Sequence, residues 1–393
     1  MNAYPDHQPL IAELSRFKTK QELLLSREYQ RHHLYLTELH GTPRVFRAES
    51  PRPKINDFLR IAHWNIEKGK HLEAIIAAFR QHPVLQAADL ISINEADVGM
   101  NRSAHRFVAR ELGEALGMHV AFAPCYLEFS KGYGDDLTMS GENTTALQGN
   151  AILSHYELKN PRIIQLPLCY DHFEHVEKRI GNRNALAVEI EINGQPLCFV
   201  TTHLEVRNAP ACRAKQIAAI LAELEKPAVP RPAIIAGDFN TNTFARGGMV
   251  RTFGGFARMM FSKPDDLRQA IAAPQSREPL FALLRKHGFT EVGFNSDDVT
   301  CYVPLKILED SGKLPVFLAS AIQHQIARYD GQLDFRLDWI IGRGVKSLGD
   351  REVIDAQSKN ASLRPQTISG LRNEMGGQIT DHDPITVDLQ LAY

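Results

Sequence analysis

The chain has 393 residues, which is enough for one large domain or two smaller ones. A formal net charge of −1 gives it no global positive field that would attract nucleic acid, although a local basic groove would suffice for that. The 44% hydrophobic and 23% charged residues are typical of a soluble globular protein, and no apolar run approaches the ~18 residues of a membrane span.

The number and spacing of the cysteines and the sequence of the first residues allow a prediction of the cellular compartment. The five cysteines are odd in number and none forms a CxxC pair, so neither a disulfide framework nor a structural zinc site is expected. The first residues lack a basic segment followed by an apolar stretch, so no signal peptide is expected. Together these observations predict a cytoplasmic protein in a reducing environment.

Residues 1–58 are expected to form an N-terminal helical extension. Residues 10–39 carry apolar side chains at roughly helical spacing among charged ones, without Gly or Pro, which predicts one or two amphipathic helices. Pro43, Pro51 and Pro53 then break the chain. We expect a catalytic domain over 59–393, with an insertion at about 243–335.

Strands and helices alternate from residue 59 onwards. Helices are expected at 72–79, 107–116 and 213–224. Asn193-Gly194 is a strong signal for a two-residue hairpin turn. Buried or alternating apolar segments predict strands at 59–66, 88–95, 119–123, 149–154, 162–166, 185–192, 196–203, 233–240, 337–341 and 385–389.

Two irregular stretches are candidates for substrate-facing loops. The stretch 243–335 is too long for a simple connection and should hold helices and loops of its own, including an amphipathic segment at 280–287. The second stretch, 129–143, is rich in Gly, Asp and Ser.

Small polar clusters follow several of the predicted strands. In layered α/β architectures, ligand and catalytic groups gather where strands end and loops begin. Each cluster taken alone could be a turn, a solvated loop or a satisfied core residue. Asp338 is the hardest to explain in that way, because a carboxylate between apolar neighbours is costly without a partner. The polar strand ends are Asn65, Glu95, His203, Asp238 with Asn240, Asp338, and Asp381 with His382.

These residue types fit a single kind of site. Hard oxygen ligands without cysteine suit Mg²⁺ or Mn²⁺ better than zinc. Magnesium is typically held by one or two carboxylates together with substrate phosphate, and it can polarise that phosphate. The composition of the strand ends therefore predicts a divalent metal and a phosphate ester as substrate.

The order of these motifs resembles that of the endonuclease/exonuclease/phosphatase superfamily, which includes deoxyribonuclease-I-like enzymes. The resemblance runs from about residue 59 to 391 and implies a four-layer α/β sandwich, with two mixed β-sheets packed face to face and helices outside. The matching segments are Trp64-Asn65-Ile66, Asn94-Glu95, Gly149-Asn150, Thr202-His203-Leu204, Gly237-Asp238-Phe239-Asn240, Leu337-Asp338-Trp339 and Thr380-Asp381-His382.

The resemblance also implies roles for individual residues. Glu95, Asn65 and Asp381 correspond to metal ligands, with Glu95 the principal one. Asp238 and Asn240 are similar to the pair that positions the attacking water and the phosphate.

His382 is similar to the catalytic histidine, and Asp338 to the carboxylate that orients it. His203 matches a second histidine that binds phosphate or assists the leaving group. Arg183 and Asn150 are weaker matches to residues that contact the substrate phosphate.

The implied activity is hydrolysis of a phosphate ester by in-line attack of water, of phosphodiesterase or nuclease type. Either Asp238 or His382 could be the base. The alternatives are a lipid or inositol-phosphate phosphoesterase similar to sphingomyelinase, and an inactive scaffold or binding module. The expected partner is the substrate itself, which is nucleic acid, a small phosphodiester or a lipid headgroup; no protein partner and no transmembrane segment are inferred.

Overall fold

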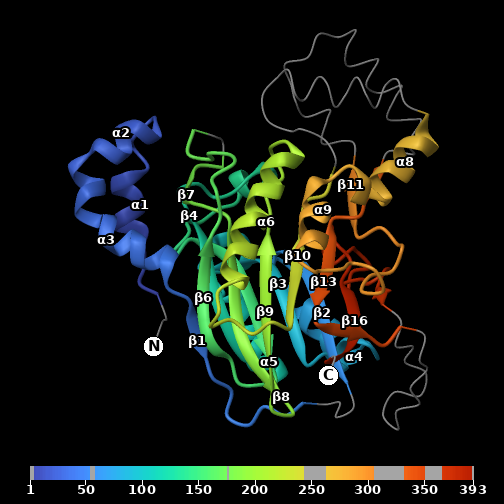
Figure 1. Ribbon diagram of the computed structural model, residues 1–393. Helices are drawn as coiled ribbons and strands as arrows, with labels where there is room; N and C mark the ends of the chain where they lie inside the picture. Colours follow the sequence, from blue (N-terminus) through green and yellow to red (C-terminus); the bar gives the residue numbers. More distant parts are fainter. Residues whose placement is uncertain are drawn as a thin grey trace.

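A computed structural model of the chain describes residues 4–53, 58–174, 177–242, 263–304, 332–349 and 365–391. Two mixed β-sheets pack face to face, and helices cover their outer faces (Figure 1). This is the four-layer sandwich that the resemblance implied, and the expectation is confirmed.

The larger sheet is built around a parallel pair, β2 (Leu59–Lys68) and β3 (Leu90–Val98). Every other pairing in this sheet is antiparallel, in the order β1-β4-β5-β3-β2-β16-β14, with β7 on β4 and β15 on β16. The remaining strands are β1 (Arg44–Phe46), β4 (His119–Glu128), β5 (Leu147–Ser154), β7 (Arg179–Gly181), β14 (Val345–Ser347), β15 (Gln366–Thr367) and β16 (Ile385–Leu391).

The smaller sheet has the order β13-β10-β9-β8-β6, and only β9 and β10 run parallel. Asn193 and Gly194 connect β8 to β9 with φ angles of 50° and 80°, which is the left-handed geometry that a two-residue hairpin turn requires. Its strands are β6 (Lys159–Gln165), β8 (Asn184–Ile192), β9 (Gln195–His203), β10 (Ala233–Asp238) and β13 (Asp338–Arg343).

Three apolar layers hold the sandwich together. The layer between the sheets contains Ile61, Phe199 and Ile340, all fully buried. Helices α4 (Leu72–Gln81) and α5 (Val108–Leu116) cover the outer face of the larger sheet, while α6 (Pro210–Leu224) and α9 (Pro279–Lys286) cover the smaller one. Helix α5 ends as its sequence predicts, at Gly117 with φ of 67°.

The N-terminal segment forms α1 (Gln8–Leu14), α2 (Lys20–Leu25) and α3 (Arg27–Gly41) rather than one or two helices. Ser26 separates the last two because its backbone is extended and its hydroxyl caps α3 by accepting from the Tyr29 N–H. Leu14 and Leu39 belong to the same apolar layer as α4 and α5, and β1 joins the larger sheet. The division into two domains at residue 58 stays a prediction.

The stretch between β10 and β13 contains helices of its own, as expected, and also a pair of strands that the sequence did not predict. Helix α8 (Pro264–Ala272) and the strand pair β11 (Cys301–Pro304) and β12 (Gln332–Phe335) share a small apolar cluster with Leu267 and Phe335. Residues 243–262 and 305–331 of the predicted insertion lie outside the described residues. Short 3-10 turns occur at Leu85–Ala87, Asn101–Ser103, Gly134–Thr138 and Pro274–Ser276. Within the described ranges, each helix is too short or too polar to cross a membrane.

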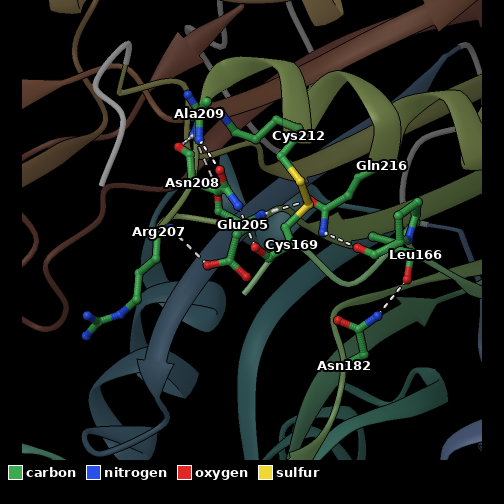
Figure 2. Close-up of a disulfide and its surroundings, with 11 residues drawn as sticks. Leu166, Cys169, Asn182, Glu205, Arg207, Asn208, Ala209, Cys212 and Gln216 are labelled. Carbon is green, nitrogen blue, oxygen red and sulfur yellow. Dashed lines mark hydrogen bonds between the residues drawn. A yellow bond between two sulfur atoms is a disulfide. The ribbon is translucent and has the colours of Figure 1, made fainter. Parts of the chain in front are cut away.

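The sequence did not predict a disulfide framework, but the structure contains the disulfide Cys169–Cys212. Cys169 and Cys212 are bonded, with their Cα atoms 6.0 Å apart, and the bond joins the segment after β6 to the first turn of α6 (Figure 2). The asparagine at 208 donates a side-chain hydrogen bond to the Cys169 carbonyl and adds a second link. An odd cysteine count did not exclude one pair, because Cys125, Cys198 and Cys301 remain buried free thiols.

Replacing both Cys169 and Cys212 by serine should lower the free energy of unfolding. The disulfide closes a loop with a sequence separation of 43, for which a chain-entropy treatment gives about 4 kcal/mol. Urea unfolding of the double variant and of the oxidised wild type measures the difference. A matched Cys125→Ser variant tests whether loss of a buried sulfur alone has the same effect. Equal midpoints for the wild type and the double variant would contradict the prediction.

Candidate active site

The register of the smaller sheet places three of the predicted residues, His203, Asp238 and Asp338, side by side on neighbouring strands. Asp238 at the end of β10 pairs with His203 of β9 on one side and with Asp338 of β13 on the other. In the larger sheet, Asn65 of β2 pairs with Asn94 of β3, directly before Glu95. The polar strand ends of both sheets therefore meet at one rim of the sandwich.

Asp238 is the centre of this arrangement and is buried. Its Oδ2 accepts a hydrogen bond from Asn65 Nδ2 at 3.1 Å and lies 3.2 Å from His203 Nε2 and 3.8 Å from His382 Nε2. Its Oδ1 accepts from the Asn240 N–H at 2.8 Å. One carboxylate thus links residues from four separate segments of the chain.

Amides join the two sheets beneath this carboxylate. Asn94 Oδ1 accepts from the Asp238 N–H at 2.8 Å, and Asn94 Nδ2 donates to Asn150 Oδ1 at 2.9 Å. The Asn150 Nδ2 donates in turn to the Asn184 carbonyl at 3.2 Å. Both ends of the Asn150 amide are engaged within the core, where its oxygen fixes Asn94, and its expected contact with the substrate phosphate stays a prediction.

Asp338 is buried and accepts hydrogen bonds at both oxygens. Oδ2 accepts from His382 Nδ1 at 2.7 Å and from Thr300 Oγ1 at 2.6 Å, while Oδ1 accepts from His63 Nε2 at 2.9 Å. Burial opposes ionisation of Asp338, but the neighbouring His382 and His63 outweigh it and lower the carboxyl pKa. Although burial disfavours the imidazolium of His382, Asp338 raises the His382 pKa well above its usual value.

His63 was not among the predicted site residues, although the sequence carried a signal. It alternates with Ile61 and Asn65 on the inward face of β2, where a histidine among apolar residues needs a partner. Because Nε2 donates to Asp338, Nδ1 is left to accept from the Ser92 hydroxyl at 2.9 Å. Thr300 was missed as well, because it lies within the predicted insertion.

The backbone around the site is unusual. Glu67, Lys68, Glu95 and Asn240 have φ angles of 46°, 70°, 59° and 51°, in the left-handed region that side chains rarely adopt. Such conformations persist where the surrounding structure imposes them, and they cluster at functional sites. At Asn240 the Nδ2 donates to the Leu204 carbonyl at 2.9 Å, which fixes the side chain as well.

Three carboxylates near the Asp238 centre, those of Glu67, Glu95 and Asp381, influence one another's ionisation. Glu67 Oε2 accepts from the Asp381 N–H at 3.2 Å, and Lys68 Nζ lies 3.4 Å from Glu95 Oε2. Asp381 is at the surface, yet desolvation by the surrounding protein and the negative charge of Glu95 raise its pKa; desolvation and Asp381 do the same for Glu67. For Glu95, desolvation is outweighed by Lys68 and His203, which lower the pKa. Carboxylates that oppose one another's ionisation favour a bound cation.

Two groups of side chains lie close enough to share a metal ion. They are Cys301 with Asp381 and His382, and Asp238 with Asp338 and His382. The second group is already satisfied by hydrogen bonds, since both oxygens of Asp338 have donors. The carboxylates of Glu95, Asp381 and Glu67 do not approach closely enough to form a third such group among the described residues, but they are oxygen donors of the kind that a hard cation prefers.

His203 and Arg183 border the same centre. His203 Nδ1 lies 3.9 Å from Glu95 Oε1, so its ring lies between Glu95 and Asp238. Burial and the positive charge of Arg183 lower the pKa of His203. Arg183 is buried, its Nε has no hydrogen-bond acceptor, and within the described part of the chain its guanidinium has no ion-pair partner.

The chain belongs to the endonuclease/exonuclease/phosphatase family, whose model matches residues 62–346. This supports phosphoester hydrolysis as the general class of activity. No curated protein matches the chain in sequence.

Solved structures similar to the chain include members of this family. The human nocturnin catalytic domain is 15% identical, with 89% of this chain and 97% of that one covered and a TM-score of 0.44. TDP2 from D. rerio, complexed with a single-strand DNA product, is 15% identical over 85% of this chain and 99% of that one, with a TM-score of 0.44. The 3′-5′ exonuclease from Neisseria meningitidis is 12% identical over 85% and 100%, with a TM-score of 0.42.

Proposed function

We propose that the chain is a magnesium-dependent phosphodiesterase in which Asp238 takes a proton from an attacking water and His382 donates to the phosphate. The observation that carries this proposal is that the His382 imidazole lies between the carboxylates of Asp238 and Asp338. Asp238 Oδ2 lies 3.8 Å from His382 Nε2, and the other nitrogen of that imidazole is held by Asp338 at 2.7 Å. A carboxylate and an oriented imidazole that face one space are suited to proton transfer.

Members of this family generally use a divalent metal. Here Glu95, Asp381 and Asn65 would hold it, and Glu67 is a further candidate because its carboxylate reaches the Asp381 backbone. Mg²⁺ or Mn²⁺ fits this oxygen-rich set, and when bound it would neutralise the phosphate and stabilise the leaving oxygen. Lys68, whose Nζ lies 3.4 Å from Glu95 Oε2, partly offsets the negative charge of Glu95.

The protein side chains supply the remaining roles in this proposal. Asp238 accepts the water proton, since its Oδ2 faces the site while Oδ1 is fixed by the Asn240 N–H. The Nδ1–H of His382 donates to Asp338, so its Nε2 is the atom that can donate to the phosphate. Arg183 and His203, whose ring lies between Glu95 and Asp238, bind phosphate oxygens.

The proposed substrate is a phosphodiester of nuclease type. The alternatives are that the substrate is a lipid or inositol-phosphate ester, or that the chain is an inactive scaffold, and an activity assay can distinguish them. A cytoplasmic location also stays a prediction. The Cys169–Cys212 disulfide weighs against it, because disulfides persist mainly in oxidising compartments.

Removal of divalent metal should abolish hydrolysis of bis(p-nitrophenyl) phosphate by the purified full chain. We expect activity with Mg²⁺ or Mn²⁺, loss of about 10³-fold or more in EDTA, and recovery when the metal is restored. Glu95→Gln should weaken Mg²⁺ binding measured by calorimetry, whereas the surface substitution Glu191→Gln should not. Hydrolysis that persists in EDTA would contradict the metal assignment. Absence of hydrolysis with every metal and ester tested would favour the scaffold.

A further inference from the structure

An aromatic and basic group lies beside the candidate site. We call Tyr126, Tyr170, His172, Arg183 and Arg207 the arginine–tyrosine wall. The guanidinium of Arg183 lies 5.8 Å from the Tyr126 ring centroid, and that of Arg207 lies 5.6 Å from the Tyr170 centroid. The His172 ring lies between the two tyrosines, at 5.8 Å from Tyr126 and 4.9 Å from Tyr170.

The charges of the wall are not balanced by direct ion pairs. Arg179, whose guanidinium lies 3.8 Å from the Tyr126 ring centroid, pairs with Glu128 at 3.3 Å and with Glu177 at 3.2 Å, and it donates to His172 Nε2 at 3.1 Å. By contrast, neither Arg183 nor Arg207 has an ion-pair partner among the side chains that the structure describes, and the buried Nε of Arg183 has no acceptor.

His172 is uncharged, so it neither neutralises the arginines of the wall nor adds to their positive charge. Burial and the positive charges of Arg179, Arg183 and Arg207 lower its pKa to about 2, so it stays neutral and accepts from Arg179. Glu205 lies outside the wall; its negative charge acts on Arg183 without direct contact, and its Oε1 accepts from the Arg207 backbone N–H at 2.9 Å. Two guanidinium groups thus remain available for an anion.

The wall adjoins the reacting centre. The pairing of β8 with β9 sets Ala185 opposite Thr202, so Arg183, two residues before Ala185, lies beside the His203 end of β9, and one end of the wall borders the proposed site of the scissile phosphate. Arg207 follows His203 by four positions, on the segment that leads from β9 into α6. The wall therefore extends from the site outward rather than forming a separate surface.

The disulfide links the two segments that carry the outer part of the wall. Cys169 precedes Tyr170 directly, and Cys212 lies in the first turn of the helix that follows Arg207. Figure 2 shows the Arg207 side chain extending away from the disulfide, while its neighbour Asn208 turns toward Cys169. The covalent link and this hydrogen bond keep Tyr170 and Arg207 at a fixed separation.

We propose that the arginine–tyrosine wall binds a second anionic group of the substrate, next to the phosphate that is cleaved. This inference rests on the proposed function and names its substrate class, an oligonucleotide with at least two phosphates. Arg183 contacts the scissile phosphate and Arg207 contacts the adjoining one, while the Tyr170 ring, 5.6 Å from the Arg207 guanidinium, helps to position it. A choline headgroup has one phosphate and a positive charge that these arginines would repel.

Binding of a fluorescent oligothymidylate in EDTA tests the proposal independently of turnover. Arg207→Gln should raise the Kd about tenfold at low salt and reduce the slope of log Kd against log salt by about 0.7, the loss of one phosphate contact to a single strand. Arg231→Gln, which removes an exposed arginine paired with Glu225, is the matched control and should change neither quantity.

Kinetics with substrates of two lengths give the second test. Arg207→Gln should raise KM about tenfold for a thymidine oligonucleotide and leave KM for bis(p-nitrophenyl) phosphate and both kcat values within about twofold. The Cys169→Ser/Cys212→Ser double variant should show the same pattern if it remains folded. Equal oligonucleotide binding by wild type and Arg207→Gln would overturn the proposal, as would tighter binding to sphingomyelin vesicles than to the oligonucleotide. Loss of hydrolysis of every ester, with binding intact, would refute the proposed function alone.

Discussion

Asp238→Asn should lower kcat for a phosphodiester about 10³-fold while KM changes little. The proposed base would be replaced by an amide that cannot accept a proton at neutral pH, and a positioned base contributes 10²- to 10⁴-fold, on the order of the expected loss. The amide nitrogen would also face the donors of Asn65 and His203 in at least one of its orientations. Steady-state kinetics with saturating Mg²⁺ measure the effect.

The controls for Asp238→Asn must show whether a loss of activity comes from lost catalysis or from misfolding. Glu191→Gln makes the same carboxylate-to-amide change at an exposed residue that pairs with Lys159, so it should retain full activity. Thermal unfolding of Asp238→Asn in EDTA reports any damage to the hydrogen bond with the Asn240 N–H. A folded Asp238→Asn variant with wild-type kcat would rule out Asp238 as the base.

Asp338→Asn should reduce kcat by about 10²- to 10⁴-fold through its effect on His382. The carboxylate accepts from His382, His63 and Thr300 at once, and an amide would present its NH₂ to at least one of these donors. The His382 ring would lose the acceptor that fixes Nδ1–H. The far-downfield proton NMR signal of that hydrogen bond should disappear together with the activity.

Two variants of residues that donate to Asp338 test whether Asp338 acts by orienting His382. Thr300→Val removes one donor to Oδ2 but leaves His382 bonded, so we expect a loss of kcat smaller than tenfold. His63→Phe should reduce stability and kcat moderately, because Asp338 Oδ1 would be left without its donor in a buried position. If Thr300→Val and Asp338→Asn lowered kcat equally, orientation of His382 would not be the function of Asp338.

The central strands and the site follow closely from local sequence patterns. Apolar runs such as 233–238 end in polar residues, and parallel pairing of β9 with β10 brings His203 level with Asp238. The motifs could be predicted because each one is short and contiguous. The hairpin at Asn193-Gly194 was predictable for the same reason, since its left-handed backbone is encoded by two adjacent residues.

Features that depend on long-range contacts were not predictable. The disulfide joins cysteines separated by 43 residues, and nothing in their spacing distinguishes this pair from the other combinations. Edge strand β1 has three residues and gains its conformation by pairing with β4, so its own sequence shows no strand pattern. His63 and Thr300 become site residues only because β2 and the insertion both reach Asp338.

The left-handed backbone at Glu95 and Asn240 has a consequence for laboratory evolution. Each such conformation costs a non-glycine residue about 1 kcal/mol or more, and position 95 carries a glutamate despite that cost. A library at position 95 that is sorted only for heat resistance should therefore drift toward asparagine or glycine. Sorting the same library for hydrolysis should return glutamate, so the two selections would pull this position in opposite directions.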